Sequence, residues 1–238
     1  NYRSLLKLVA ITNNVKNYYQ KKFNINANKI IVAPSGTSIE NKFFNISKNK
    51  KKLNIGYFGS LYKSRGVDLI LRLSKIDRDN KYFIFGNLKN YKNIKNKFYN
   101  QNLYLSDYLP YKSVPKNILK MDVLLMPYQE KIVAAGNIGN IIDFMSPLKL
   151  FDYMACGKII ISSQVKVLQE ILKEKRNVIF IKNFNNAYAW KKEIQKIKFL
   201  NEKRQIISQN NFKMSKNYKE KERAKKILES LNYNFNRN

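Results

Sequence analysis

Histidine is absent from this 238-residue chain, and Cys156 is its only cysteine. The lack of histidine excludes a Ser-His-Asp triad, a histidine general base and most zinc sites. A single cysteine excludes an intramolecular disulfide and a thiolate metal cluster, and it fits a reducing cytoplasm. Any chemistry of this chain must therefore use other side chains.

Long hydrophobic runs are also missing. Apolar stretches such as Val123–Met126 and Ile159–Ile161 are far too short to cross a bilayer. The apolar stretch Leu5–Ile11 is interrupted by Lys7, and no small-residue cleavage site follows it, so we expect no signal peptide. The chain begins with Asn1 rather than methionine, from which we expect a fragment of a longer protein.

Acidic residues are scarce, because 16 Asp and Glu stand against 46 Lys and Arg, which gives a net charge of +30. Such a charge suggests nucleic acid or anionic lipid as a partner. The basic residues, however, are spread through every segment and mixed with many Asn and Ile, as an AT-rich genome would produce. Composition bias is the favoured explanation, an anionic partner is the alternative, and the run Lys48–Lys52 is interpreted as a solvated loop.

Glycine is rare as well, at 8 of 238 residues, or about 3% against a usual ~7%. The glycines that are present should occupy positions where the backbone conformation tolerates few other residues. Gly59, Gly66 and Gly86 follow predicted strands, at the edge where open α/β sheets bind ligands. Each could be an ordinary turn residue, but their joint placement favours a site.

Short apolar runs alternate with amphipathic stretches, a pattern typical of an α/β fold with a doubly wound parallel sheet. The predicted strands are 29–33, 53–58, 82–85, 102–105, 122–126, 158–161 and 178–181. The predicted helices are 14–23, 67–76, 91–99, 114–120, 148–155, 165–172, 187–200 and 218–231. The last helix carries Ala224, Ile227, Leu228 and Leu231 on one face.

We divide the chain into residues 1–45, 46–215 and 216–238. The first part is a small separate piece that ends in a polar linker, the second is the main α/β domain, and the third is a C-terminal helix.

The first candidate site is the glycine-rich segment Gly56–Gly66, which follows a predicted strand and leads into a helix. Free backbone N–H groups and a helix N-terminus attract anions, and Arg65 or Lys63 could bind phosphate. The segment matches neither a P-loop nor the dinucleotide-binding glycine pattern. A plain strand-to-helix turn is an equally good interpretation of these residues alone.

The second candidate site is the segment Ser146–Lys158. Ser146 is predicted as the N-cap and Pro147 as the first residue of a helix. Asp152 lies about a turn and a half into this largely apolar helix, where its carboxylate could bind a sugar diol while phosphate rests on the N-terminal amides. An Asp152 that only bonds a neighbouring backbone group is the alternative, and local physics favours neither.

Several segments resemble glycosyltransferase family 4, in that family's order along the chain. They are Ala10–Thr12, Lys29–Val32, Pro34–Gly36, Phe58–Leu61, Arg65–Asp68, Asp122–Tyr128 and Ser146–Ala155, followed by Ser162, Ser163 and Glu170. The resemblance implies a Rossmann-like, C-terminal half of a GT-B fold, preceded by the end of the N-terminal acceptor domain.

The resemblance also implies a retaining transfer of a sugar from a nucleotide-diphosphate donor to a glycan or lipid-linked acceptor, without metal or cofactor. It places the diphosphate near Gly59, Ser60 and Arg65, and the ribose at Asp152. The phosphates or donor sugar would face the backbone amides around Pro147 to Lys149, a stretch that includes Leu148 and follows Ser146. Arg65, Lys149 and Asp152 are the expected catalytic group. Charge on the departing nucleotide would be stabilised by these cations and the helix dipole.

Three departures from the family's pattern affect the expected site. Ser60 stands where the family often has a basic residue, Asp152 replaces a glutamate, and Phe144 occupies the position of the first acid of a spaced pair, with Asp143 adjacent. A non-catalytic nucleotide-sugar-binding subunit is therefore one alternative, and a nucleic-acid-binding α/β protein is a weaker one. The leading interpretation is an envelope glycosyltransferase in the cytoplasm, in peripheral contact with an anionic membrane at its inner face, with no nucleic acid partner.

Overall fold

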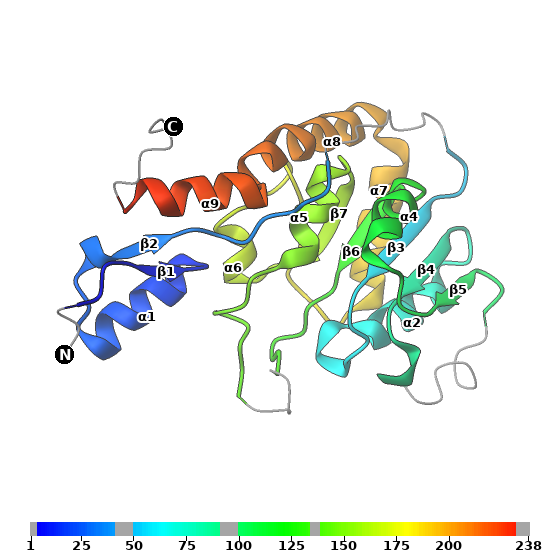
Figure 1. The fold of residues 1–238 in the computed structure, drawn as a ribbon. Helices are drawn as coiled ribbons and strands as arrows, with labels where there is room; N and C mark the ends of the chain where they lie inside the picture. The colour runs from blue at the N-terminus through cyan, green and yellow to red at the C-terminus, as the bar shows by residue number, and fades with distance from the viewer. Residues whose placement is uncertain (1–3, 41–49, 91–99, 134–138, 232–238) are drawn as a thin grey trace.

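A parallel six-stranded sheet forms the centre of the molecule in the computed structural model, which describes residues 4–40, 50–90, 100–133 and 139–231 (Figure 1). The strand order is β5-β4-β3-β6-β7-β8, and every neighbouring pair is parallel. The strands are β3 (Asn54–Phe58), β4 (Lys81–Phe85), β5 (Leu103–Ser106), β6 (Val123–Met126), β7 (Ile159–Ser163) and β8 (Ile179–Ile181). The order reverses direction between β3 and β6, so a ligand-binding crevice is expected beyond their carboxyl ends.

Helices cover both faces of this sheet, as the alternation of side chains requires. Val123, Leu125, Ile159 and Ile161 face α2 and α7, whereas Leu124, Met126 and Ile160 face α4, α5 and α6. The helices are α2 (Val67–Ile76), α4 (Val114–Leu119), α5 (Leu148–Ala155), α6 (Lys166–Gln169), α7 (Ala187–Phe199), α8 (Asn201–Ser215) and α9 (Glu220–Glu229). Short 3₁₀ helices are η1 (Ala27–Lys29), η2 (Lys63–Arg65), η3 (Leu88–Asn90), η4 (Tyr111–Ser113) and η5 (Lys216–Tyr218). The fold is thus α/β and doubly wound, which confirms the predicted class.

A second, two-stranded parallel sheet precedes the main one. It pairs β1 (Leu8–Ala10) with β2 (Ile30–Val32) and carries α1 (Asn13–Phe23) between them. Its small core consists of Ala10, Ile25 and Ile30, with partly buried neighbours. None of the residues of α1 is fully buried.

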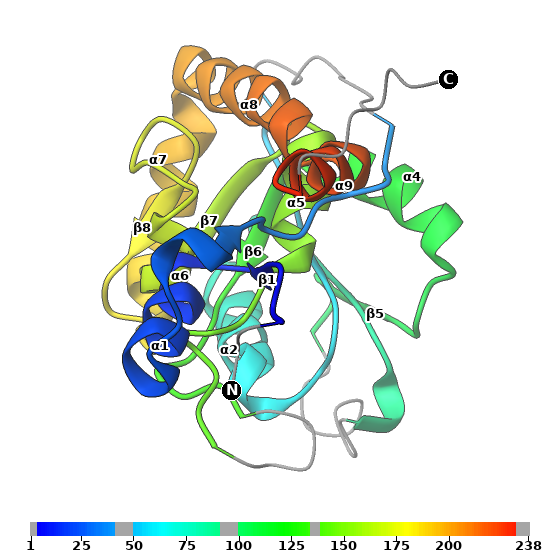
Figure 2. The same cartoon turned by 60° about the vertical axis from the view of Figure 1, so that its left-hand side comes forward.

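The small sheet is joined to the main body by specific polar contacts. The Glu170 carboxylate, at the end of α6, accepts hydrogen bonds from the backbone N–H groups of Asn13 (2.8 Å) and Asn14 (3.4 Å) at the start of α1. On the other side, Arg223 of α9 donates to the carbonyl of Ala33 (3.1 Å), which follows β2. Figures 1 and 2 show α9 lying along the segment that leaves β2. Negative charge at a helix N-terminus is favourable, so Glu170 both caps and anchors α1.

The structure confirms the seven predicted strands and the existence of seven of the eight predicted helices, with shifts at their ends. The eighth, Tyr91–Tyr99, lies outside the described residues. The sequence analysis missed β1 and did not delimit α8. Along the predicted apolar face of α9, Ile227 and Leu228 are half-buried and Leu231 is 42% exposed.

Within the described residues, no helix is both long and apolar enough to cross a membrane.

Gly66 explains how two loops can meet beside the crevice. Its φ is +78°, and a β-carbon there would lie 1.8 Å from the carbonyl oxygen of Pro127, at the end of β6. Only glycine fits such a backbone contact without displacement. The start of α2 is therefore fixed against the end of β6.

Candidate functional site

A cavity of about 590 Å³ opens beyond the carboxyl ends of β3, β4 and β5, next to the start of α5. It is lined by Phe58, Gly59, Ser60, Arg65, Phe85, Gly86, Asn87, Tyr108, Leu109, Tyr111, Val114, Ile118, Tyr128, Ser146, Leu148, Lys149, Asp152 and Tyr153. This is the crevice that the strand order predicts. We call it the donor cleft, because the resemblance described above would place the sugar donor here.

The donor cleft brings together seven of the eight residues predicted for the site. Gly59, Ser60 and Arg65 come from the segment after β3, while Ser146, Leu148, Lys149 and Asp152 come from the start of α5. Pro147 is buried and does not line the cleft. The side chain of Lys63, the alternative phosphate ligand, lies outside the described part of the structure.

Ser146 differs from its prediction in a way that matters for the site. The residue before α5 is Pro147 rather than Ser146, and no side chain caps the helix. The Ser146 Oγ is instead buried and has no hydrogen-bond partner in the described structure. A buried hydroxyl without a partner is costly, so a bound polar group at this position would be favourable.

Two cations, Arg65 and Lys149, lie close together in the donor cleft. The Lys149 Nζ lies 4.1 Å from the centroid of the Tyr57 ring, and the Arg65 guanidinium lies 5.8 Å from that of Tyr128. Burial, and secondarily the charge of Arg65, lowers the pKa of Lys149 to about 7. Among the residues that the structure describes, no ion pair involves either cation. The cleft therefore carries positive charge that an anionic ligand would neutralise.

Asp152 points into the same cleft and accepts two hydrogen bonds from hydroxyls. Thr37 Oγ1 donates to its Oδ1 at 2.6 Å, and the Tyr111 hydroxyl donates to the same oxygen at 3.0 Å. Burial raises the pKa of the Asp152 carboxyl, and both hydrogen bonds oppose that shift. Both described donors are side chains from distant segments. The alternative, in which Asp152 bonds only a neighbouring backbone group, therefore does not describe these contacts.

Phe144, which stands where the family resemblance would place the first acid, makes a packing contact in this chain. The Phe144 ring packs edge-to-face against Tyr18 of α1, with 5.5 Å between centroids. Neither Phe144 nor the adjacent Asp143 lines the donor cleft. The chain thus has an aromatic contact to the small sheet where the resemblance would place a carboxylate.

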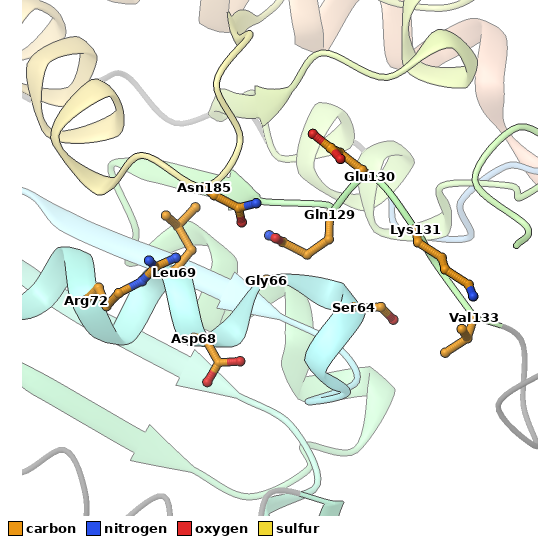
Figure 3. Close-up of a pocket in the computed structure, with 10 residues that line it drawn as sticks. All are labelled: Ser64, Gly66, Asp68, Leu69, Arg72, Gln129, Glu130, Lys131, Val133 and Asn185. Carbon is orange, nitrogen blue, oxygen red and sulfur yellow. The ribbon is translucent and has the colours of Figure 1, made fainter.

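A second cavity, of about 530 Å³, lies on the other side of the segment after β3. Figure 3 shows Gln129, from the loop after β6, and Asn185, from the loop after β8, beside the start of α2. Acidic and basic side chains are mixed there, since Asp68, Arg72, Glu130 and Lys131 all line it. Ser64 and Gly66 of the first candidate segment line it, but none of the eight residues predicted for the nucleotide-sugar site does.

Several cleft residues were missed by the sequence analysis. Asn87, Tyr108 and Tyr111 follow β4 and β5, and only their position after strands could have indicated them. Thr37 does not line the cleft but bonds Asp152, and nothing local in the sequence connects these two residues.

No group of three or more Cys, Asp or Glu side chains suited to a metal ion occurs in the described part of the chain.

The profile of one protein family, glycosyl transferases group 1, matches residues 38–214. The chain belongs to this family. No curated protein sequence matches the chain.

Solved structures with the same fold include glycosyltransferases, and the three described next have low sequence identity to this chain. One from Rickettsia africae ESF-5 is 14% identical with a TM-score of 0.75, covering 99% of this chain and 65% of its own. Anabaena HepE in complex with UDP is also 14% identical, with a TM-score of 0.73 and coverages of 95% and 64%. WaaG, a glycosyltransferase involved in lipopolysaccharide biosynthesis, is 14% identical, with a TM-score of 0.68 and coverages of 94% and 62%. The chain spans less than two thirds of the length of each.

Proposed function

We propose that this chain is the donor-binding part of a family 4 glycosyltransferase. Its substrate would be a nucleotide-diphosphate sugar, and its acceptor a glycan or lipid-linked sugar. The observation that carries the proposal is the pair Arg65 and Lys149, which line the same cleft as Ser146 and make no ion pair among the described residues. The structure of HepE with UDP-glucose, which has the same fold, supports it.

In the proposed reaction, these residues act on the leaving nucleotide. The bond between the anomeric carbon and the donor phosphate oxygen breaks, and negative charge grows on the diphosphate. The acceptor oxygen forms the new bond to the anomeric carbon, and its hydroxyl proton passes to the leaving phosphate. Arg65, protonated Lys149 and the N-terminal amides of α5 would stabilise that charge, the type of contribution that dominates many enzymatic rate enhancements. We propose retention of configuration at the sugar from the resemblance to family 4.

Calorimetry with UDP, GDP and ADP tests the proposal. We expect the wild-type chain to bind at least one of them, and Arg65→Ala to weaken that binding by roughly 1.5–3 kcal/mol, the value of a hydrogen bond to a charged group. The matched control is Arg72→Ala, because Arg72 lines the second cavity and not the donor cleft. Binding that Arg65→Ala leaves unchanged would contradict the assignment, and salt-dependent DNA binding without nucleotide binding would favour a nucleic-acid-binding protein.

A non-catalytic nucleotide-sugar-binding subunit is the second candidate, favoured by one observation. Phe144 contacts Tyr18 instead of presenting an acid to the donor. Slow hydrolysis of a bound nucleotide sugar would favour the enzyme, whereas tight binding without any turnover, including in a chain extended upstream, would favour the subunit.

We also propose that donor binding needs no divalent metal, because Arg65 and Lys149 can neutralise a diphosphate directly. Magnesium beside phosphates is normally held by one or two carboxylates. Nucleotide affinity should be the same with EDTA and with added magnesium. A tenfold or greater loss on chelation would contradict the proposal.

Contact with the cytoplasmic face of an anionic membrane is a further part of the proposal. Residues 1–39 contain six Lys and Arg and no acid. Leu6, Tyr18 and Phe23 of this part are exposed. Basic residues beside exposed aromatic and aliphatic side chains favour anionic lipid surfaces. Co-sedimentation with phosphatidylserine vesicles, but not with phosphatidylcholine vesicles, is the expected result.

A further inference from the structure

The two hydroxyls that bond Asp152 come from parts of the chain far from it in sequence. Thr37 is 115 residues away, in the segment between the two sheets, and Tyr111 is 41 residues away, in η4 after β5. Both donate to the same oxygen, Oδ1. Within the described residues, no hydrogen bond ends on Oδ2.

Thr37 is held in place more firmly than an ordinary loop residue. It is 1% exposed, its N–H donates to the Tyr218 carbonyl (2.9 Å), and its Oγ1 also accepts from the N–H of Ile39 (3.0 Å). The preceding Gly36 touches the start of α9 so closely that a β-carbon would lie 2.7 Å from the backbone of Lys219 and Glu220. The Thr37 hydroxyl is therefore a fixed donor, positioned by the segment between the sheets and by α9.

Fixing one carboxylate oxygen restricts the rotation of the whole group, because a planar carboxylate on a short side chain has only two torsions. With Oδ1 committed to Thr37 and Tyr111, the direction of Oδ2 is restricted as well, and Asp152 lines the donor cleft. A carboxylate fixed in advance loses little conformational entropy when it accepts ligand hydroxyls. Tyr111 is 46% exposed and lines the cleft beside Asp152, so a ligand there also contacts its ring.

We propose that Thr37 and Tyr111 are positioning residues for ribose recognition: they orient Asp152 so that the cleft selects a ribonucleotide over the corresponding 2′-deoxyribonucleotide. The inference rests on the proposed function and extends it to the choice of pentose. It also connects ribose recognition to the segment between the two sheets.

The test is the ratio of two dissociation constants, measured by calorimetry on the full 238-residue chain. Whichever of UDP, GDP and ADP binds best is compared with its 2′-deoxy counterpart. One hydrogen bond to a charged group corresponds to about tenfold or more in affinity. We expect the wild type to prefer the ribonucleotide by about tenfold, and Thr37→Val and Tyr111→Phe each to lower that preference to about threefold.

Two comparisons separate positioning from a general structural effect. Thr37→Ser keeps the hydroxyl and should restore the wild-type ratio. Tyr188→Phe removes a hydroxyl from an exposed tyrosine outside the cleft and should leave the ratio unchanged. Should Thr37→Val not fold, the exposed position of Tyr111 makes Tyr111→Phe the decisive variant.

An equal loss of affinity for both nucleotides would overturn the inference, since it would indicate a structural role only. A wild-type ratio near one, or a ratio that neither variant changes, would also overturn it, while nucleotide binding itself would leave the proposed function intact. A wild type that binds no nucleotide would overturn the proposed function, and this inference with it.

Discussion

Lys149 and Gly59 are matched to each other: the Lys149 Nζ lies 2.9 Å from the position that a β-carbon on Gly59 would occupy. The absence of a side chain at Gly59 leaves room for this ammonium in the donor cleft. The ammonium is partly desolvated there, which is the main reason that its pKa falls to about 7.

The first prediction follows from that pKa. Below pH 7 Lys149 is charged, and the affinity for a diphosphate should be at its highest. Above pH 7 the amine must be protonated before it can contribute to binding, which costs up to about 1.4 kcal/mol of binding free energy per pH unit. Nucleotide affinity should therefore fall between pH 7 and 9. In Lys149→Arg, which stays charged over this range, affinity should be nearly constant. Calorimetry at several pH values checks this, and parallel profiles for the two proteins would contradict it.

The second prediction concerns Gly66, whose α-carbon faces the Pro127 carbonyl. Gly66→Ala should reduce the free energy of unfolding by about 3 kcal/mol or more, because a positive φ and a backbone clash add together. Gly139→Ala is the matched control, since Gly139 also has a positive φ (+65°) but a β-carbon there would meet nothing within 4 Å. It should cost about 1–2 kcal/mol. Urea unfolding of both variants is the measurement, and equal losses would refute the close contact.

The third prediction concerns Asn211, a buried side chain of α8. Its Nδ2 donates to the carbonyls of Lys158 and Asn177, each at 2.8 Å. Asn211→Ala leaves both carbonyls without this donor and should cost about 2–4 kcal/mol of unfolding free energy. The neighbouring Asn210 makes one exposed bond, to the Arg176 carbonyl, so Asn210→Ala should cost about 1 kcal/mol. Thermal and urea unfolding of both variants give the two losses of unfolding free energy, and equal losses would contradict the prediction.

The fourth prediction concerns sugar transfer by the chain alone. Transfer requires an acceptor hydroxyl at attack distance from the anomeric carbon, and such positioning supplies several kcal/mol of the barrier. The two-stranded sheet offers little surface for that, so we expect donor binding with little or no transfer. A version extended upstream, assayed with one labelled donor and a membrane extract, should transfer far faster. Equal turnover would contradict this expectation.

The strands of the main sheet could be predicted because their apolar runs are short, continuous and bounded by polar residues, as around Ile159–Ile161. Helix α8 was not delimited, because its buried stripe includes Arg204, Ser208 and Asn211. A polar stripe gives no hydrophobic periodicity. Two of its members bond carbonyls of the main body: Ser208 donates to Gly157, and Asn211 donates to Lys158.

The candidate site was predictable only where its residues lie in segments with a local sequence pattern. Arg65, Lys149 and Asp152 lie in recognisable segments, and the cleft contains all three. Thr37 could not be predicted, because its role depends on the path of the chain between the sheets. The expected cap at Ser146 was wrong, since the local preference for serine at a helix start does not decide where that hydroxyl points.

The small β1–α1–β2 sheet has a consequence for how the molecule opens. Two paired strands with so small a core are marginal by themselves, so much of their stability must come from Glu170 and Arg223, which belong to the main body. Such a unit should open below the free energy of global unfolding. Amide protons of Val9 and Ile31 should then exchange with solvent well before those of Leu124 and Ile160 at the centre of the sheet. Neutralising Glu170 should speed amide exchange in the small sheet further, and it should leave the exchange rates of Leu124 and Ile160 unchanged.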